Sequence, residues 1–302
     1  MESRYLSTAD ASRALGVSVS TVKRWVDDGI LPAHKTAGGH RKLLLSDILR
    51  LGRAGRLPNL DVRRVELLSL QEMPRDVPSL REEARRVLRS GETGSIRSLL
   101  MGGYQAGIPI DQLFDEVVLP GLSHVDEGIA PGQSHRRLLA RQECKAALYE
   151  LKAVLELRAC QNCPAAVGGA ISGDQDLTYS LLIQLCLIEA AWEPINLGAN
   201  TPFASLFDAV NEVRPKLLWI TVSGPLQNEE IIEEYNRLYS HASKEGVSVL
   251  LHGPGLTDHQ RRLMSYTSYA DRMSHVSAFA RTLNPPPALP RRGRPASSFT
   301  GS

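Results

Sequence analysis

The sequence predicts a multidomain chain that joins a winged helix-turn-helix head, a four-helix bundle and an α/β domain with a five-stranded parallel sheet of the flavodoxin or Rossmann type. Three observations predict it. Residues 1–57 combine two short helical patterns with a basic, glycine-containing hairpin. Residues 79–158 repeat apolar residues at spacings of three and four, as helices of a shared core do. Residues 159–284 alternate short apolar runs with helical patterns, which is typical of a parallel sheet covered on both faces.

The head starts with two helical patterns separated by a tight turn. Gly16 closes the first helix, and Ser18 or Ser20 can cap the second, because a hydroxyl accepts hydrogen bonds from free first-turn amides. The second helix, residues 21–26, is polar and basic on most of its surface. Trp25 shares its apolar face with two valines, so we expect this ring in the core. Helix, short turn and basic second helix predict a recognition helix for the DNA major groove.

A basic hairpin follows the second helix. Its Gly38-Gly39 pair suits a tight turn, and the resulting wing can lay four basic side chains along DNA phosphates. These four are Lys35, His40, Arg41 and Lys42. We therefore expect the head to bind a double-stranded DNA operator. The alternative is a small helical domain with a solvated basic face.

Charge is distributed unevenly along the chain. The formal net charge of the whole chain is only +2, yet residues 1–57 hold ten Lys and Arg against five Asp and Glu. The tail, residues 285–302, adds three arginines and no acid, and its proline- and serine-rich composition predicts a disordered basic segment. Positive charge is thus concentrated at both ends, where it suits a phosphate backbone.

Composition excludes several classes of protein. No run reaches the roughly 18 apolar residues of a membrane span, so we expect no membrane contact. The first residues do not resemble a signal peptide, and four cysteines are too few for a disulfide scaffold. We therefore expect a cytoplasmic, nucleoid-associated protein. Cys160 and Cys163 lack a second Cys or His pair at metal-ligand spacing, so no metal site is expected.

The remaining elements follow from periodicity. Residues 58–78 contain glycines and prolines that break long helices, and we interpret them as a linker. The expected bundle helices are residues 80–89, 95–107, 110–118 and 135–157. The expected strands are residues 165–171, 194–197, 216–222, 247–251 and 268–273. Ligands of such sheets bind beyond the carboxyl ends of the strands. His252 is expected in a loop at one of these ends.

Three features of the head occur in order: a tryptophan-bearing second helix, the exit Gly29-Ile30-Leu31-Pro32, and the wing Gly38-Gly39-His40-Arg41. At these residues the segment resembles the winged helix-turn-helix of the MerR and excisionase group. The resemblance implies base or phosphate contacts from the second helix and further contacts from the wing. The expected DNA-contacting residues are Ser20, Thr21, Lys23, Arg24, Lys35, His40, Arg41 and Lys42.

A helical bundle and an α/β domain behind such a head resemble the light-responsive repressors that join MerR heads to a cobalamin-binding module. In that family the loop after the first strand carries Asp-x-His-x-x-Gly, where the His ligates cobalt and the Gly leaves room for the nucleotide tail. The corresponding residues here are Asp174, Asp176 and Tyr179. Such a cobalt site favours imidazole over a carboxylate, and a phenol ring would fill the tail slot. The ligand motif is therefore degenerate.

Other motifs of that family match this sequence only in part. Ser223 and Leu226 partly match a Ser-x-Leu motif after the third strand, and Gly253 partly matches a Gly-Gly motif after the fourth. Val125 stands where the family places a tryptophan over the upper cobalt face, and His135 alone remains of a Glu-His pair. We therefore expect the fold without its cofactor, with cobalamin as the alternative.

These observations predict a transcriptional regulator of MerR type and not an enzyme. No long dimerisation helix follows residue 51, so we expect a homo-oligomer formed through the bundle or the α/β domain. The α/β domain would sense an unknown small ligand or a protein partner. Three alternatives stay open: a cobalamin-dependent light-sensing repressor with an unusual lower ligand, a DNA-bound scaffold whose α/β domain docks a protein, and a corrinoid enzyme subunit.

Overall fold

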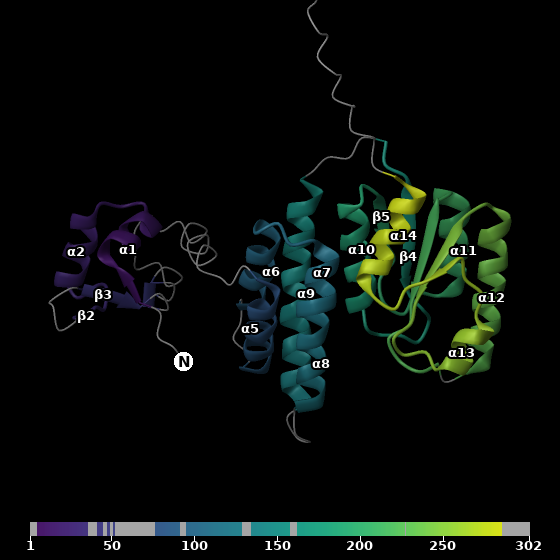
Figure 1. Ribbon diagram of the computed structural model, residues 1–302, viewed down its shortest axis with the longest axis horizontal. Helices are drawn as coiled ribbons and strands as arrows, with labels where there is room; N and C mark the ends of the chain where they lie inside the picture. Colours follow the sequence, from purple (N-terminus) through teal and green to yellow (C-terminus); the bar gives the residue numbers. More distant parts are fainter. Residues whose placement is uncertain are drawn as a thin grey trace, which may run out of the picture. The chain divides into compact units, whose positions relative to one another are not determined.

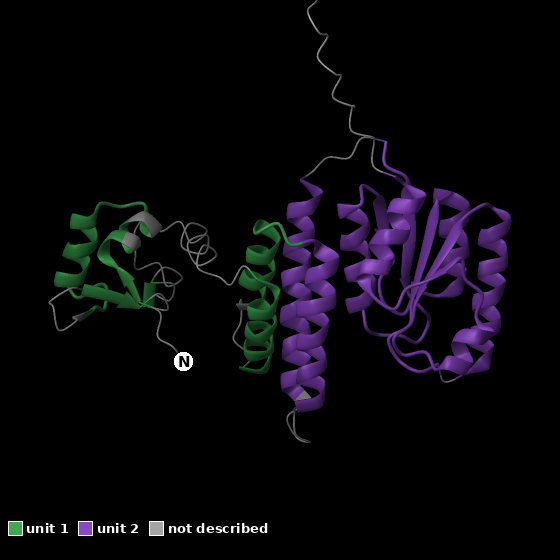
Figure 2. Ribbon diagram, in the orientation of Figure 1, with its two compact units in different colours: residues 1–108 green, residues 109–302 purple. Residues whose placement is uncertain are grey.

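The computed structural model describes residues 5–35, 41–44, 47–48, 51, 76–90, 95–128, 134–157, 162–226 and 228–285. Its architecture is an N-terminal helix-turn-helix, a helical region and a five-stranded parallel sheet with helices, as expected from the sequence. The chain divides into two units, residues 1–108 and residues 109–302 (Figure 2). This division falls inside the segment expected to form the bundle. Among the described residues, every helix is too short or too polar to span a membrane.

The head folds around a small apolar core. Its regular elements are β1 (Tyr5–Ser7), α1 (Thr8–Leu15), α2 (Val19–Asp27), β2 (His34–Lys35) and β3 (Arg41–Leu44). The three strands pair antiparallel in the order β1-β3-β2. Leu15, Val22 and Leu43 are buried together with Trp25, which confirms that this indole is a core residue. Strand β1 is not predicted by the sequence pattern, because three residues are too few to show strand alternation.

The helical region contains every helix that the periodicity predicts. In the first unit these are α5 (Val77–Ser90) and α6 (Ser95–Gln105). In the second unit they are α7 (Ile110–Leu113), the π-helix η1 (Phe114–Val118) and α9 (Ser134–Glu156). Helix α5 shows why the pattern works: it buries Leu80, Ala84, Val87 and Leu88, which share one helical face.

One helix, α8 (Leu119–Gly128), is missing from the sequence-based prediction, which ends the preceding helix at Val118. Pro120 is the physical reason for the difference, because a proline inside an α-helix removes a hydrogen bond and clashes with the preceding turn. Here the chain widens into the π-helix just before it, and the N–H of Leu119 donates to the carbonyl of Phe114, five residues back. The wider turn lets the helix continue through the proline.

The α/β domain is a doubly wound parallel sheet. Its strands are β4 (Ala165–Ala170), β5 (Glu193–Asn196), β6 (Leu217–Thr221), β7 (Ser248–His252) and β8 (Ser268–Tyr269), in the order β5-β4-β6-β7-β8. This is the flavodoxin-like order. Its helices are α10 (Thr178–Glu189), α11 (Phe203–Val213), α12 (Glu229–Lys244), α13 (Asp258–Leu263) and α14 (Met273–Leu283). Figure 1 shows α10 and α14 on one face of the sheet and α11 and α12 on the other.

The fit of β4 against the central strand β6 explains why β4 has a glycine at position 168. Trp219 of β6 is fully buried, and its indole N–H donates to Ser180 of α10 over 3.0 Å. A Cβ atom at Gly168 would overlap the Trp219 ring, so no other residue fits beside this indole. The Trp219–Ser180 bond in turn fixes the start of α10, which follows the loop expected to carry the cofactor motif.

Asp115, on the π-helix, attaches this helical segment to the α/β domain. Its carboxylate accepts hydrogen bonds from the backbone N–H groups of Met273 (2.7 Å) and Ser274 (3.0 Å), at the start of α14. Arg272 pairs with the same carboxylate at 3.3 Å, and the Asp115 side chain is only 3% exposed. The carboxylate therefore caps α14 from another element, where the helix dipole favours a negative charge.

Replacement of this cap tests its role. Asp115→Ala should lower the free energy of unfolding by about 1–2 kcal/mol, because the first amides of α14 lose their acceptor. The neighbouring Asp271 is exposed, so Asp271→Ala should change the free energy by no more than about 0.5 kcal/mol. Urea denaturation followed by circular dichroism measures both values. Equal effects of the two substitutions would contradict the assigned cap.

Candidate functional site

Helix α2 presents polar side chains on the side away from the head's core. Ser20, Lys23 and Arg24 are exposed, whereas Val22 and Trp25 are buried beneath them. The Ser18 hydroxyl accepts a hydrogen bond from the N–H of Thr21 and caps the helix. It also lies 2.7 Å from the Ser20 hydroxyl and 2.8 Å from that of Thr21. Hydroxyls and cations thus gather at the helix end that such domains turn toward base edges.

The wing lies beside this helix. Strands β2 and β3 place His34 opposite Lys42 and Lys35 opposite Arg41, as the expected hairpin requires. The Lys42 side chain is exposed. The expected contact residue His40 and the side chain of Lys35 lie outside the described residues.

The side chain of Arg41 does not project freely from the wing but is held by contacts with α2. Its guanidinium donates to the backbone carbonyl of Lys23 (3.2 Å) and pairs with Asp27 at 2.7 Å. Arg41 therefore joins the wing to the end of α2, where it sets the angle between them. Asp27 is not recognisable as its partner from the sequence, because the two residues are fourteen positions apart and no local pattern links them.

Asp174 ties together two loops at the carboxyl edge of the sheet. Its carboxylate accepts hydrogen bonds from the N–H of Ser223 (2.6 Å), from the Ser223 hydroxyl (2.5 Å) and from the N–H of Asp176 (3.0 Å). The loop after β4 and the loop after β6 are thereby joined. Two residues that the resemblance selected, Asp174 and Ser223, do lie together.

Asp176, at the position of the family's cobalt ligand, is engaged by an arginine. One oxygen lies 2.7 Å from Arg141 of α9, and the other accepts a hydrogen bond from the N–H of Thr178. The same guanidinium pairs with Asp126 of α8 at 2.6 Å. This three-residue bridge, Asp126–Arg141–Asp176, joins α8, α9 and the loop after β4. No local pattern pointed to Asp126 or Arg141, which lie far from Asp176 along the chain.

Tyr179 packs beside a buried histidine. Its ring centre lies 5.2 Å from that of His252, and burial raises the pKa of its phenol. His252 ends β7 and is 2% exposed, so its expected place in a loop is wrong. Strand pairing with β6 carries the regular backbone one residue further than the apolar run. Nδ1 of His252 lies 2.7 Å from the carbonyl of Ala270, which can only accept, so Nδ1 carries the proton.

This leaves the Nε2 atom of His252 buried without a hydrogen-bond partner. Burial lowers the pKa of this imidazole, which keeps it neutral. The Thr221 hydroxyl is also buried without a partner, and the strand register sets Thr221 beside His252. The hydroxyl of Thr178, next to Tyr179, is a third such group. Three polar groups near Tyr179 are therefore each short of a hydrogen bond.

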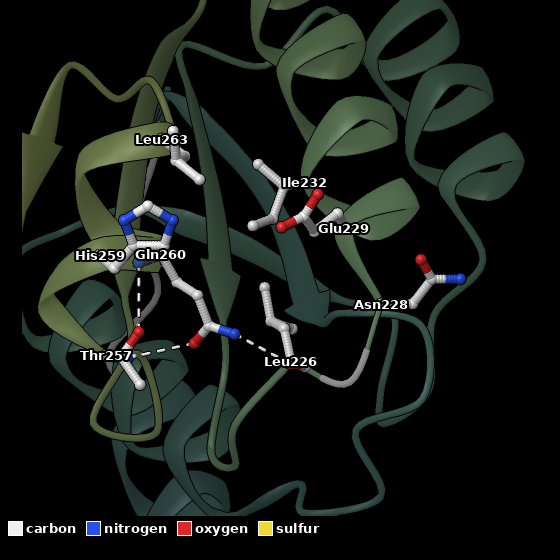
Figure 3. A pocket seen from close by; sticks show the side chains of 8 residues that line it. All are labelled: Leu226, Asn228, Glu229, Ile232, Thr257, His259, Gln260 and Leu263. Carbon is white, nitrogen blue, oxygen red and sulfur yellow. Dashed lines mark hydrogen bonds between the residues drawn. The ribbon is translucent and has the colours of Figure 1, made fainter.

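The other residues selected by resemblance are scattered. Val125 is buried in α8, and His135 is exposed at the start of α9. Leu226 lines a hollow of about 280 Å³ between the loops after β6 and β7 (Figure 3). There Gln260 donates to the carbonyl of Leu226 and shares a capping box with Thr257. A Cβ atom at Gly253 would overlap the Leu256 side chain, so this glycine makes room for its own turn.

Comparison with known proteins gives separate matches for the head and for the rest of the chain. A helix-turn-helix domain family matches residues 5–58, so the head is a DNA-binding helix-turn-helix. No curated protein matches the sequence. Among solved structures, the monomethylamine corrinoid protein of Methanosarcina barkeri is similar at 12% identity and a TM-score of 0.55, over 69% of this chain and 100% of that one. This similarity confirms the expected fold of the helical and α/β region.

Two further structures match with lower scores. One is a cobalamin-binding protein from Desulfitobacterium hafniense, with 18% identity, a TM-score of 0.35, and coverage of 72% of this chain and 98% of that one. The other is a methanol:cobalamin methyltransferase complex from Methanosarcina barkeri, with 16% identity, a TM-score of 0.37, and coverage of 72% and 83%.

The neutral, buried state of His252 predicts a pH dependence of stability. Because its pKa is lowered in the folded protein, the unfolded chain takes up the proton first as the pH falls. The folded state therefore loses stability below about pH 6.5, the ordinary pKa of histidine. His252→Asn keeps an N–H donor for the carbonyl of Ala270 but cannot titrate. Urea denaturation at about pH 7.5 and pH 5.5 should show a smaller loss in this variant than in the wild type.

An exposed histidine provides the control for this comparison. His259 lies on the surface of α13, so His259→Asn should leave the pH dependence of the wild type in place. If His252→Asn loses as much stability on acidification as the wild type, the buried imidazole is not the group responsible.

Proposed function

We propose that this protein is a transcriptional regulator of MerR type, whose head recognises an operator. The observation that carries the proposal is the exposed Ser20–Lys23–Arg24 face of α2, held outward by the buried Trp25. The excess of basic residues in the head supports it, because counterion release drives association with DNA. We also propose that the chain regulates transcription and does not catalyse a reaction.

We further propose that the α/β domain has lost cobalamin binding. A lower ligand at position 176 would be a carboxylate already bound by Arg141, so cobalt would have to displace a guanidinium at 2.7 Å. The Tyr179 ring, packed on His252, stands where the family leaves space for the nucleotide tail. These residues do not fit the cofactor as the family holds it. The domain is then a sensor for another small ligand or a docking module for a protein partner.

One observation favours a second candidate, a cobalamin-dependent repressor with an unusual lower ligand. The unpartnered Nε2 atom of His252 is a neutral nitrogen donor close to the carboxyl edge of the sheet. Such a donor could reach a ligand only if the Tyr179 ring moved away. This candidate is second because cobalamin could bind only if the Tyr179 ring were displaced and the Asp126–Arg141–Asp176 bridge were broken.

DNA binding by the full-length protein tests the first proposal. After selection of a preferred duplex, Arg24→Ala should reduce discrimination against mismatched sequences by about 1–3 kcal/mol if Arg24 reads a base edge. Lys42→Ala should weaken binding to all duplexes and reduce the magnitude of the salt slope by about 0.9, the value for one phosphate contact. Arg41→Ala should also weaken binding, through loss of its bonds to Lys23 and Asp27. Fluorescence anisotropy at several salt concentrations gives these values.

A charge in the second unit, outside the head, provides the matched control. Arg237 is exposed on α12, and Arg237→Ala should leave affinity and salt slope unchanged. The assignment of the head is wrong if Arg24→Ala and Lys42→Ala bind as the wild type does.

Absorbance tests the second proposal. The wild type, mixed with excess adenosylcobalamin and gel-filtered, should carry no corrin absorbance, because position 176 offers no free ligand. The double variant Asp176→His/Tyr179→Gly should retain measurable cobalamin, whereas Asp176→His alone should gain little. A stoichiometric corrin spectrum in the wild type would overturn the loss of cobalamin but leave the DNA-binding proposal standing.

A further inference from the structure

Helix α9 carries an exposed apolar face in addition to its buried one. Leu138, Leu139 and Tyr149 are 64%, 53% and 51% exposed, and Leu157 immediately follows the helix with 83%. These are four of the eleven large exposed apolar side chains among the described residues, so such surface is concentrated on α9 and the residue that follows it. The buried face of α9 is complete without them: it consists of Ala140, Cys144, Ala147, Leu148, Leu151 and Leu155.

Two of these residues, Leu139 and Tyr149, belong to a set of exposed α9 residues with the spacing of a helix that pairs with another helix. Leu139, Ala146 and Ala153 are seven residues apart, and so are Gln142 and Tyr149. All five are exposed, and they combine one leucine, one tyrosine, two alanines and a single uncharged polar residue. A seven-residue repeat places side chains along one seam of a helix pair. We call this seam, residues 139, 142, 146, 149 and 153, the α9 seam.

Charge is polarised along α9 in a way that suits an antiparallel partner. Residues 134–145 hold four Lys and Arg against one Glu, whereas residues 146–156 hold one Lys against two Glu. The first turn contains no acid, although the positive end of the helix dipole favours one. A second α9 running antiparallel would bring its acidic, dipole-negative half to this basic start. A parallel partner would instead set the two basic halves side by side.

We propose that the α9 seam binds the α9 seam of a second copy of this chain, with the helices antiparallel and a twofold axis at Ala146. The small Ala146 lets the two helices approach closely where they cross. Leu139 lies opposite Ala153 of the other copy, seven residues to the other side of the axis. Gln142 lies near Tyr149 of the other copy, where its amide can hydrogen-bond the phenol hydroxyl. Each contact away from the axis occurs twice, as an isologous interface requires.

The ends of the paired helices complement each other in charge. With the axis at Ala146, Arg136 lies opposite Glu156 of the other copy, ten residues to either side. Glu156 already pairs with Lys152 of its own helix at 2.7 Å, and a carboxylate can accept from more than one cation. Both residues are exposed, so this contact contributes to the direction of pairing more than to its strength.

This surface supplies the pairing that the proposed regulator needs, and in that respect it rests on the proposed function. Helix-turn-helix dimers bind two half-sites related by twofold symmetry. One helix pair buries less than the roughly 1,600 Å² of a standard interface. The dimer is therefore expected to dissociate at low protein concentration and to be favoured by a two-half-site duplex.

Disulfide formation in the full-length protein tests the seam and its direction. Ala146→Cys places two thiols at the axis, and mild oxidation should give a covalent dimer on a non-reducing gel. In a dimer of the Ala153→Cys variant, the introduced thiol of one copy would lie fourteen residues along the helix from that of the other copy. This separation, about 21 Å, is beyond the reach of a disulfide. Ala153→Cys should stay monomeric, and Leu139→Cys/Ala153→Cys should cross-link. The wild type, with its native cysteines, sets the background.

Sedimentation equilibrium supplies an independent measurement. Leu139→Glu should raise the dimer dissociation constant at least tenfold, whereas Leu263→Glu, on exposed α13, should not. Both side chains are exposed, so neither change threatens the fold. A monomeric wild type at high concentration would overturn the proposal, as would a dimer that Leu139→Glu leaves intact or cross-linking of Ala153→Cys as fast as Ala146→Cys. Half-site binding by a monomer would leave the DNA-binding proposal intact, so the two failures are distinguishable.

Discussion

The guanidinium of Arg141 holds the helical segment of the second unit against the carboxyl edge of the sheet. It bonds Asp176 at 2.7 Å and Asp126 at 2.6 Å, and all three side chains are partly exposed. Isolated surface ion pairs contribute only about 0–1 kcal/mol, but here the pairs form a network, because Asp176 also accepts a hydrogen bond from the N–H of Thr178. Asp115 holds the same segment to α14. An edge that binds ligands in similar folds is thus occupied by the protein's own side chains.

Much of the fold was readable from local pattern, because helix and strand periodicities need only neighbouring residues. All five strands of the parallel sheet were predicted, and so were four helices of the helical region. The two failures have specific causes. Strand β1 gains its conformation only by pairing with β3, which lies some forty residues away. Helix α8 continues through Pro120 because a π turn precedes it, and no periodicity of the sequence announces such a turn.

Site residues could be predicted from the sequence only where it matches a motif of a known family. The resemblance located Asp174, Asp176 and Tyr179, and in the structure Asp174 accepts a hydrogen bond from the N–H of Ser223, another residue that the resemblance selected. The partners that define their chemistry were not readable: Arg141 lies thirty-five residues from Asp176, and His252 more than seventy from Tyr179. In the head, the pattern identified Arg41 as a cation but could not show that Asp27 already neutralises it. Charge pairing across elements depends on tertiary structure, which single-sequence patterns do not contain.

The π turn at residues 114–118 has a consequence for how this segment tolerates insertions and deletions. A π turn, with its hydrogen bond between residues five apart, contains one residue more than an α turn. Each residue of an α-helix turns the chain by about 100° about the helix axis, so the extra residue rotates the following helix by about that angle. Loss of a single residue there would restore ordinary helical phase and swing the side of α8 that carries Val125 out of the core. A deletion in this turn would therefore disturb the packing of all of α8 and not only the position that is removed.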